Sequence, residues 1–433
     1  MDLNSDSTER PGSTLCRAVV VLLFASALLA GCAGCDTGED DGCDPPCNSG
    51  EVCNRVTGQC VPVRLSRFDQ DVPGHQLSMT QTQGRVYLSA IEPSNGYLLV
   101  GDLTDSGPRM YILRQFQSLN DTSLSIASNS DLVVVGWLSD DGRYRLATHR
   151  LDGEADRWRT VPIQGASGFD YDGTADFDVA ADNAGVLHLT FRDGTEGHLS
   201  HISVDDEDQW AIQTVDDRTP QANGDGQSGE PTCPDGTPIT SNEGLGYDPA
   251  LLVRGSDLLV VYQDRDCGDL RLARRLEDVW AASTVDQGGL GVSPGRSTGF
   301  TGGHPSIAVD SSGRLALAYQ DVTRSQLVFA FQRDGEFQFE VVDRGFEIDE
   351  FSQRRKHLVG SFASLVFDDE DRPWIAYMDT TETSLKLADR TSSLDEAGDW
   401  ELDTVDIEPP TGFSAQLVGG YVGVESLRPA DAG

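Results

Sequence analysis

The chain is poor in lysine and in positive charge of any kind. Lys356 and Lys386 are its only lysines, and 32 Lys and Arg residues stand against 71 Asp and Glu, a formal net charge of −39. Because phosphate binding requires clustered cations, this balance excludes nucleic acid as a partner and disfavours anionic lipid headgroups. We interpret the acidic surface as a source of solubility, with recruitment of cations as the functional alternative.

Long hydrophobic runs are missing from the chain after its N-terminal region. No stretch in that part of the sequence reaches the length of a transmembrane helix. The sequence also lacks a nucleophile elbow, a P-loop, an HExxH motif and a dinucleotide-binding fingerprint. Sequence motifs therefore identify no group of catalytic residues. The hydrophobic content of 38% is ordinary for a globular protein, which excludes a disordered acidic chain.

Residues 1–31 predict an export signal. The apolar run at 18–31 follows Arg17 and has the length of a signal-peptide core, too short to span a bilayer. It ends in Leu29-Ala30-Gly31-Cys32, which resembles the lipobox of bacterial lipoproteins. The resemblance implies cleavage before Cys32 and a diacylglycerol on its sulfur, and more than one acyl chain anchors a protein stably. An ordinary signal peptide followed by a structural cysteine is the alternative.

The expected location is the export side of a bacterial cell envelope, at the outer membrane or cell surface. Residues 32–62 would then form a lipidated tether. Within it, four cysteines follow the spacing C-x3-C-x5-C-x6-C: Cys43, Cys47, Cys53 and Cys60. So short a segment cannot bury a core, and clustered cysteines in an exported chain indicate two disulfides. Zinc is the alternative, but no His lies nearby. The segment resembles a truncated EGF-like module, and its pairing stays open.

Residues 63–433 carry a repeated unit, which is clearest at 304–343. Four short apolar runs, at 306–309, 315–319, 327–331 and 337–342, are separated by turn signals such as Asp-Ser-Ser-Gly. Runs of this length are too short for helices, and the residues between them are typical of hairpin turns. The unit therefore predicts a four-stranded antiparallel sheet.

Two markers repeat along the chain. The first marker is an aromatic-x-acid pattern at the end of the second strand of a unit. The second marker lies at the end of the fourth strand and consists of an aromatic residue, four further residues, a small apolar residue and usually Asp. The first begins at Phe191, Tyr262, Tyr319 and Tyr377, and more weakly at Ala90 and Trp137; the second begins at Trp210, Trp280, Phe337 and Trp400, and partly at Trp158. Recurrent four-stranded units are typical of propeller blades.

We therefore predict an all-β fold, a β-propeller of six four-stranded blades. Runs at 63–68, 413–418 and 421–427 leave open an incomplete seventh blade that closes the ring, since a ring of sheets must seal its edges. The repeat resembles those of exported bacterial propellers related in style to the Asp-box repeats of the sialidase group. The resemblance implies the fold and leaves the function undetermined.

Blade topology predicts one face that carries the strand two to three hairpins together with the inter-blade links. Acids at the ends of second strands, Asp264, Asp321 and Asp379 with Glu92 and Asp193, should ring this face. They are candidates for binding a cationic ligand or Ca²⁺, which is the candidate cofactor. The alternative is that each acid accepts hydrogen bonds from its own hairpin. His304 is a further candidate ligand-binding residue.

Two features unique to single blades fall on the same face. The link at 216–247 contains Cys233, which we expect to form a disulfide with Cys267 and so pin the loop. The link at 343–360 contains the only basic cluster, Arg354, Arg355, Lys356 and His357, a candidate site for a carboxylate or another anion. Charge compensation of neighbouring acids is the alternative for this cluster.

The leading functional hypothesis is a lipid-anchored surface protein whose propeller is a non-catalytic scaffold that binds a protein or a glycan. The rival is a sialidase-like glycoside hydrolase or lyase. Glycoside hydrolysis needs paired carboxylates at a set separation. The resemblance to sialidases implies a further requirement for three arginines and for a tyrosine nucleophile with its glutamate. A purely architectural envelope component is the third reading.

Overall fold

The computed structural model describes residues 51–54, 59–62, 77–92, 96–104, 107–116, 124–138, 143–151, 158–161, 176–193, 197–217, 232–233, 239, 244–276, 278–288, 299–348, 354–382 and 384–405. The chain divides into two compact units, one of residues 1–67 and 105–107 and one of residues 68–104 and 108–433. Every described secondary-structure element is a strand. The described residues include no helix long and apolar enough to cross a membrane.

The first unit contains one described hairpin, β1 (Glu51–Asn54) and β2 (Gln59–Pro62). The antiparallel register places Cys53 directly opposite Cys60. Cys32, Cys43 and Cys47 lie outside the described residues, so the lipidation and the pairing expected there stay predictions.

The second unit consists of six four-stranded antiparallel sheets, which confirms the predicted fold class. Blade 1 is β3 (Leu77–Thr82), β4 (Arg85–Glu92), β5 (Tyr97–Thr104) and β6 (Gly107–Gln115). Blade 2 is β7 (Leu124–Ser128), β8 (Leu132–Leu138), β9 (Tyr144–Arg150) and β10 (Arg159–Val161). Blade 3 is β11 (Phe177–Ala181), β12 (Leu187–Asp193), β13 (His198–Val204) and β14 (Trp210–Asp216).

Blade 4 is β15 (Tyr247–Arg254), β16 (Asp257–Asp264), β17 (Asp269–Leu276) and β18 (Val279–Gln287). Blade 5 is β19 (Gly303–Val309), β20 (Leu315–Asp321), β21 (Gln326–Arg333) and β22 (Glu336–Asp343), the unit read most clearly from the sequence. A small hairpin, β23 (Phe346–Ile348) and β24 (Arg354–Lys356), stands in the link to blade 6. Blade 6 is β25 (Val359–Phe367), β26 (Pro373–Asp379), β27 (Ser384–Arg390) and β28 (Trp400–Val405).

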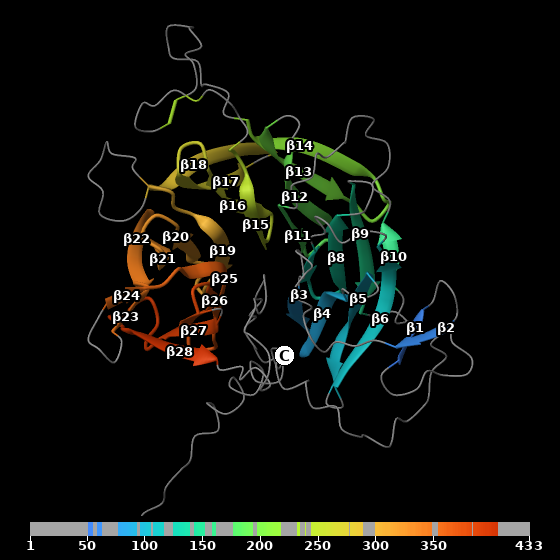
Figure 1. Ribbon diagram of the computed structural model, residues 1–433. Helices are drawn as coiled ribbons and strands as arrows, with labels where there is room; N and C mark the ends of the chain where they lie inside the picture. Colours follow the sequence, from blue (N-terminus) through green and yellow to red (C-terminus); the bar gives the residue numbers. More distant parts are fainter. Residues whose placement is uncertain are drawn as a thin grey trace, which may run out of the picture. The chain divides into compact units, whose positions relative to one another are not determined.

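The blades follow one another around a central axis, with the first strand of each blade innermost (Figure 1). Contacts run from β3 to β7 and on through β11, β15 and β19 to β25. The runs assigned to a seventh, closing blade lie outside the described residues.

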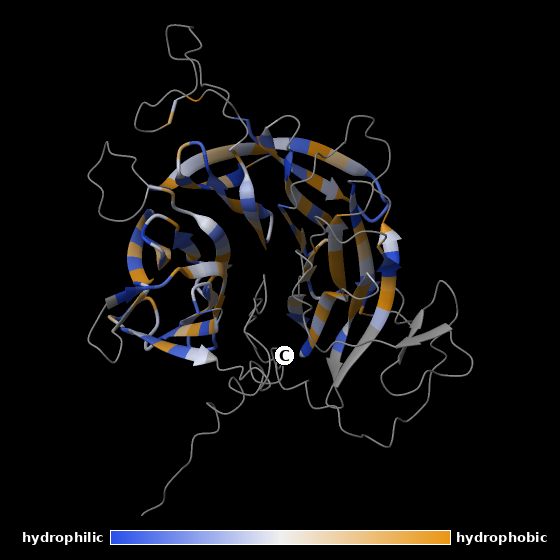
Figure 2. Ribbon diagram, viewed as in Figure 1, coloured by the Kyte–Doolittle hydropathy of each residue, from blue (hydrophilic) through white to orange (hydrophobic). Residues whose placement is uncertain are grey.

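The core is divided into five hydrophobic clusters, one between each pair of consecutive described blades. Second strands supply much of it: every residue of β8 and of β20 is buried, and β8 is among the most apolar strands in Figure 2. Blades 2 to 5 therefore bury both faces against their neighbours, which explains why their second strands are continuous apolar runs rather than alternating patterns.

The repeated sequence markers form the junctions between blades. In β14, β18 and β22 the ladder shifts register one residue before the terminal Asp, leaving Val215, Val285 and Val342 as bulges. The following Asp accepts a hydrogen bond from the second-strand Tyr hydroxyl of the next blade: Asp216 from Tyr262, Asp286 from Tyr319 and Asp343 from Tyr377. Both markers are thus parts of one latch that holds consecutive blades together.

Turn chemistry explains another repeated acid. Between first and second strands, Oδ1 of Asp182, Asp310 and Asp368 accepts the backbone N–H four residues on, at 2.8 to 2.9 Å. Asn129 holds the equivalent turn of blade 2 in the same manner. Side chains of this type mimic a backbone turn, so these residues build hairpins.

Candidate binding pocket in the central channel

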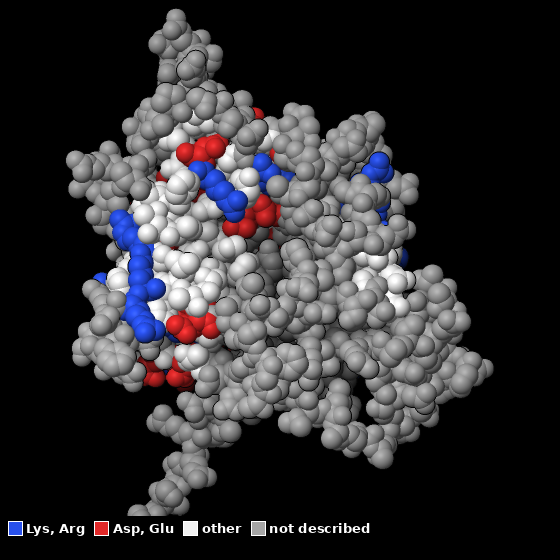
Figure 3. All heavy atoms as spheres, in the orientation of Figure 1, with Lys and Arg blue, Asp and Glu red and all other residues white. Residues whose placement is uncertain are grey.

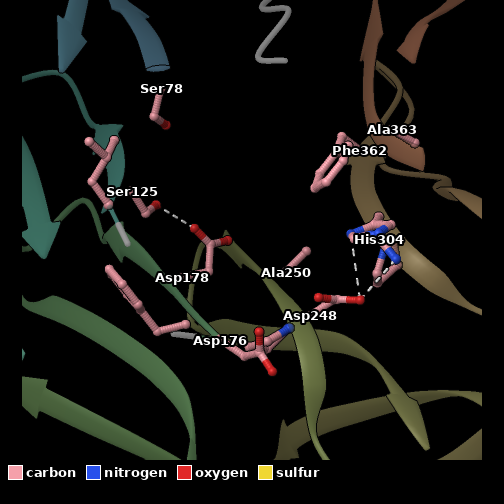
Figure 4. Close-up of a pocket in the computed structure, with 13 residues that line it drawn as sticks. Ser78, Ser125, Asp176, Asp178, Asp248, Ala250, His304, Phe362 and Ala363 are labelled. Carbon is pink, nitrogen blue, oxygen red and sulfur yellow. Dashed lines mark hydrogen bonds and ion pairs between the residues drawn. The ribbon is translucent and has the colours of Figure 1, made fainter. Parts of the chain in front are cut away.

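A pocket with a volume of about 170 Å³ opens in the channel between the innermost strands. All six blades line it. The lining residues are Ser78, Leu124, Ser125, Asp176, Phe177, Asp178, Asp248, Pro249, Ala250, His304, Pro305, Phe362 and Ala363. Figure 4 shows the side chains of Ser125 and Asp178 on one side of a shared space, with His304 and Phe362 across from them and Asp248 between.

Three of the polar and aromatic side chains of the pocket come from one repeated backbone feature. Asp248, His304 and Phe362 occupy equivalent positions in β15, β19 and β25, where each ladder shifts register. Their φ angles are 48°, 45° and 54°, in the left-handed region that residues other than glycine rarely adopt. Backbone conformations of this kind persist where the surrounding structure enforces them and gather at functional sites.

A glycine two residues earlier makes each bulge possible. Gly246, Gly302 and Gly360 have φ angles of 81°, 80° and 91°. A Cβ on Gly302 would lie 2.9 Å from the Cβ of Leu270, the first apolar residue of the third strand in the preceding blade. The backbone must therefore approach the neighbouring blade closely before it turns His304 toward the channel.

Two carboxylates meet at the base of the pocket. Burial raises the pKa of Asp176 to about 7, and the negative charge of Asp248 acts in the same direction. Oδ2 of Asp248 accepts the backbone N–H of His304 at 3.2 Å and lies 3.6 Å from His304 Nδ1. It also lies 3.7 Å from Nη2 of Arg265. The His304 ring packs on Phe362, with ring centroids 4.1 Å apart.

Asp178 joins three blades beneath the opening. Its Oδ1 accepts the Ser125 hydroxyl at 2.6 Å, and its Oδ2 accepts the backbone N–H of Leu251 at 2.8 Å. Burial raises its pKa to about 6 despite these hydrogen bonds. We interpret Asp178 as part of the wall that shapes the pocket.

Tyr247 lies between two guanidinium groups next to the paired carboxylates. Arg265 stacks on its ring at 3.6 Å and Arg192 at 4.4 Å, a cation–π arrangement. Both arginines lower the pKa of Asp176, against the larger effect of burial. The stack therefore supplies positive charge just outside an otherwise acidic pocket.

The second-strand acids predicted as ligand-binding residues face their own hairpins. Asp264 accepts the backbone N–H groups of Asp266 and Cys267, both at 3.1 Å. Asp321 accepts the N–H of Arg324 at 2.8 Å and binds its guanidinium, also at 2.8 Å. Asp379 accepts the N–H groups of Thr381 and Glu382. All three are nearly inaccessible, at 0–2% exposure, which matches the hairpin alternative.

The described members of the basic cluster differ in exposure. His357 is buried, and its Nδ1 lies 2.8 Å from Oδ2 of Asp379, so it ties the link between blades to the β26–β27 hairpin. Arg355 and Lys356 are exposed. Arg354 belongs to β24. Of the predicted candidates, the structure brings only His304 into the pocket.

The expected disulfide is present between Cys233 and Cys267, with 5.3 Å between their Cα atoms. It pins the long link before blade 4 to the β16–β17 hairpin. The same hairpin holds the end of that link through Arg265 N–H to Gly244 carbonyl, at 2.7 Å.

Sequence reasoning missed Asp176, Asp248 and Phe362. The signal for Asp248 and Phe362 is a repeated tripeptide spacing, Gly-x-X at the start of first strands, which is present as Gly246-Tyr-Asp248, Gly302-Gly-His304 and Gly360-Ser-Phe362. Asp176 does not follow a glycine at this spacing. The third position differs in each of these three blades. Latch residues recur because the three junctions from blade 3 to blade 6 use the same contact, whereas the variable third position is free to be selected for the pocket.

Metal binding finds no support in the described residues, where no group of three or more His, Cys, Asp or Glu side chains is arranged to hold an ion. The pocket instead offers hydrogen-bond acceptors, an imidazole and an aromatic face.

The chain is an all-β, six-bladed propeller with a pocket in its central channel. No protein-family model matches the chain, and no curated protein matches it. Among solved structures, the SapL1 lectin in complex with α-methyl fucoside is 11% identical, with a TM-score of 0.47 over 79% of this chain and 99% of the lectin.

A six-bladed lectin from Aleuria aurantia is 9% identical, with a TM-score of 0.46 over 79% of this chain and 99% of that chain. A sialidase from Trypanosoma rangeli is 12% identical, with a TM-score of 0.43 over 82% of this chain and 56% of the sialidase. These similarities concern the fold alone.

Proposed function

We propose that this protein is a non-catalytic glycan-binding protein whose central pocket receives one sugar residue. The observation that carries the proposal is the combination of Asp176, Asp248 and His304 with the ring of Phe362 around one small space. Carboxylates form short, strong hydrogen bonds with hydroxyl donors. An aromatic ring provides an apolar face for the C–H side of a sugar.

The size of the pocket limits the ligand. Its volume of about 170 Å³ is below the range of roughly 300–1,000 Å³ typical of drug-sized ligands. A single ring fits this space, and the remainder of an oligosaccharide would extend out of the channel. The expected ligand is thus the terminal residue of a glycan.

A glycan array followed by isothermal titration with the best ligand tests this proposal. Phe362→Ala removes the stacking face, and we expect it to weaken binding about two- to tenfold, since an aromatic contact contributes roughly 0.5–1.5 kcal/mol. Leu402→Ala changes an exposed apolar residue of the outermost strand of blade 6 and serves as the matched control. Binding that is equal in wild type and Phe362→Ala would exclude this pocket as the site.

A glycoside hydrolase is the second candidate, and the Asp176–Asp248 pair favours it. Neighbouring carboxyl groups whose environments separate their pKa values are the usual arrangement for acid–base chemistry. Against it, the described residues that line the pocket include no Tyr, Arg or Glu, and the neighbouring Tyr247 is stacked with Arg265 and Arg192. The tyrosines of the blade junctions, Tyr262, Tyr319 and Tyr377, are buried against Asp partners. Release of a labelled leaving group that disappears in Asp176→Asn would establish the enzyme.

Membrane attachment is a further part of the proposal. It is supported by the apolar run at 18–31 and by the Leu29-Ala30-Gly31-Cys32 sequence that follows it. An anchored propeller would present its pocket to glycans outside the membrane. Metabolic labelling with a fatty acid tests the anchor: label should attach to the wild-type protein and be absent from Cys32→Ser.

A further inference from the structure

A second surface lies on the face of blades 5 and 6 that carries the inter-blade links. Four large apolar side chains there are roughly half exposed: Phe300 before β19, Val322 in the β20–β21 hairpin, Phe346 in β23 and Leu358 after β24. They are half of the large apolar residues exposed in the described part of the chain. We call the segments 299–302, 322–326, 344–346 and 355–358 the outer strip.

Backbone contacts join these segments. The N–H of Phe300 donates to Thr323 Oγ1 at 2.6 Å, and the N–H of Thr323 donates to the Phe300 carbonyl. The turn at Gly345 packs against the carbonyls of Ser325 and His357, each within 2.6 Å of where its Cβ would stand. The strip is therefore one continuous and ordered surface.

The charge of the strip opposes that of the whole molecule. Arg344, Arg355 and Lys356 are exposed, whereas the half-buried Arg324 is paired with Asp321 at 2.8 Å. The four segments themselves contain no Asp or Glu. Asp321, Asp343 and Glu347 flank them, and Glu347 stands opposite Arg355 in the β23–β24 hairpin, so Arg344 and Lys356 are the cations on which the strip depends. Figure 3 shows Lys and Arg side chains in a line along the side where Figure 1 places β22, β23 and β24.

Cross-strand register mixes the two kinds of side chain. Phe346 stands opposite Lys356 in the β23–β24 hairpin, and directly opposed residues of a ladder project from the same face. Leu358 follows two residues after Lys356. Cationic and apolar groups therefore alternate along the strip.

We propose that the outer strip binds an anionic polysaccharide, a linear chain whose sugar rings bear carboxylate groups. Such a chain places negative charges at regular intervals, and its rings have apolar faces that suit Phe346 and Phe300. Guanidinium groups bind carboxylates through paired hydrogen bonds. A line of cations, rather than a cluster around one point, fits an extended polyanion better than a single terminal group. The strip is separate from the central pocket and does not require it.

Affinity electrophoresis and titration against polygalacturonate test the proposal with the whole chain. We expect the double variant Arg344→Gln/Lys356→Gln to weaken binding about tenfold, as expected for two exposed charge contacts. Wild-type affinity should fall as salt rises. Arg85→Gln/Arg150→Gln removes two exposed cations of blades 1 and 2 and should bind as wild type does. Thermal melting checks that each variant is folded.

Three results would overturn the proposal: no binding to polygalacturonate, equal loss in both double variants, or equal affinity for polyglutamate, which would indicate an acidic protein partner instead. Binding to anionic vesicles but not to polygalacturonate would assign the strip to a membrane surface and also contradict it. Phe362→Ala separates this proposal from the pocket, because it should leave binding of polygalacturonate unchanged.

Discussion

The hydroxyl of Tyr319 in blade 5 donates a hydrogen bond to Oδ2 of Asp286 in blade 4, at 2.8 Å. Both residues are buried, and Asp286 also accepts the Thr301 hydroxyl. We expect Tyr319→Phe to lower the free energy of unfolding by about 1–3 kcal/mol, since it withdraws a donor from a buried carboxylate.

Urea denaturation of a double-mutant cycle with Asp286→Asn measures this interaction. The two substitutions should be non-additive by about 0.5 kcal/mol or more. Additive effects would show that the latch contributes nothing beyond packing. Phe191 occupies the equivalent position of blade 3, so the ring without its hydroxyl is compatible with the fold.

Gly302→Ala tests the backbone that carries His304. A Cβ there meets Leu270 at 2.9 Å in addition to the strain of a φ near 80°. We expect a loss of unfolding free energy of more than about 1 kcal/mol, together with weaker ligand binding in the pocket. Gly335→Ala is the control, because its φ is 86° but nothing lies within 4 Å of the added Cβ. Equal costs for the two variants would refute the role assigned to the close contact.

The Cys233–Cys267 disulfide should stabilise the second unit. For a sequence separation of 34 residues, the chain-entropy model gives about 3–4 kcal/mol. Chemical denaturation of Cys233→Ser/Cys267→Ser, compared with wild type without reductant, checks this value. A midpoint that is unchanged would mean that the link before blade 4 is held by its other contacts alone.

Stability should fall in acid through His201. Burial lowers its pKa to about 3, with His188 and Arg275 adding to the effect; His188 Nδ1 lies 3.1 Å from His201 Nε2. The unfolded chain protonates this group near pH 6.5, so it binds more protons than the folded state between about pH 6.5 and 3. The stabilising contribution is complete above pH 6.5 and is lost as pH falls, by at most about 1.4 kcal/mol per pH unit.

His201→Gln removes this titration. Urea unfolding at a series of pH values should give a shallower acid slope for the variant than for wild type below pH 6.5. Parallel slopes would contradict the assignment of acid sensitivity to this imidazole.

The blades were predictable because their markers are repeated. Tyr319 and Asp321 recur in other blades with the same neighbours, and recurrence exposes the alternation of strand and turn. Their roles in latch and hairpin also follow from recurrence, since every blade must solve the same packing problem. Cys233 and Cys267 were predictable as a pair because the topology brings their two loops to one face.

The pocket was harder to predict. Asp248, His304 and Phe362 share no residue type, and their approach to one another depends on a left-handed backbone that the sequence signals only through a preceding glycine. His304 was found, but its partners come from other blades and far along the chain. The raised pKa of Asp176 likewise depends on burial, which no linear spacing encodes.

The most direct test of the account is a crystal structure of the propeller with the preferred sugar of the glycan array. We predict density for one sugar ring in the central channel, with a ring face on Phe362 and hydroxyl groups within hydrogen-bond distance of Asp248 and Asp176. Density only at the hairpins of Asp264, Asp321 and Asp379, with an empty channel, would contradict it.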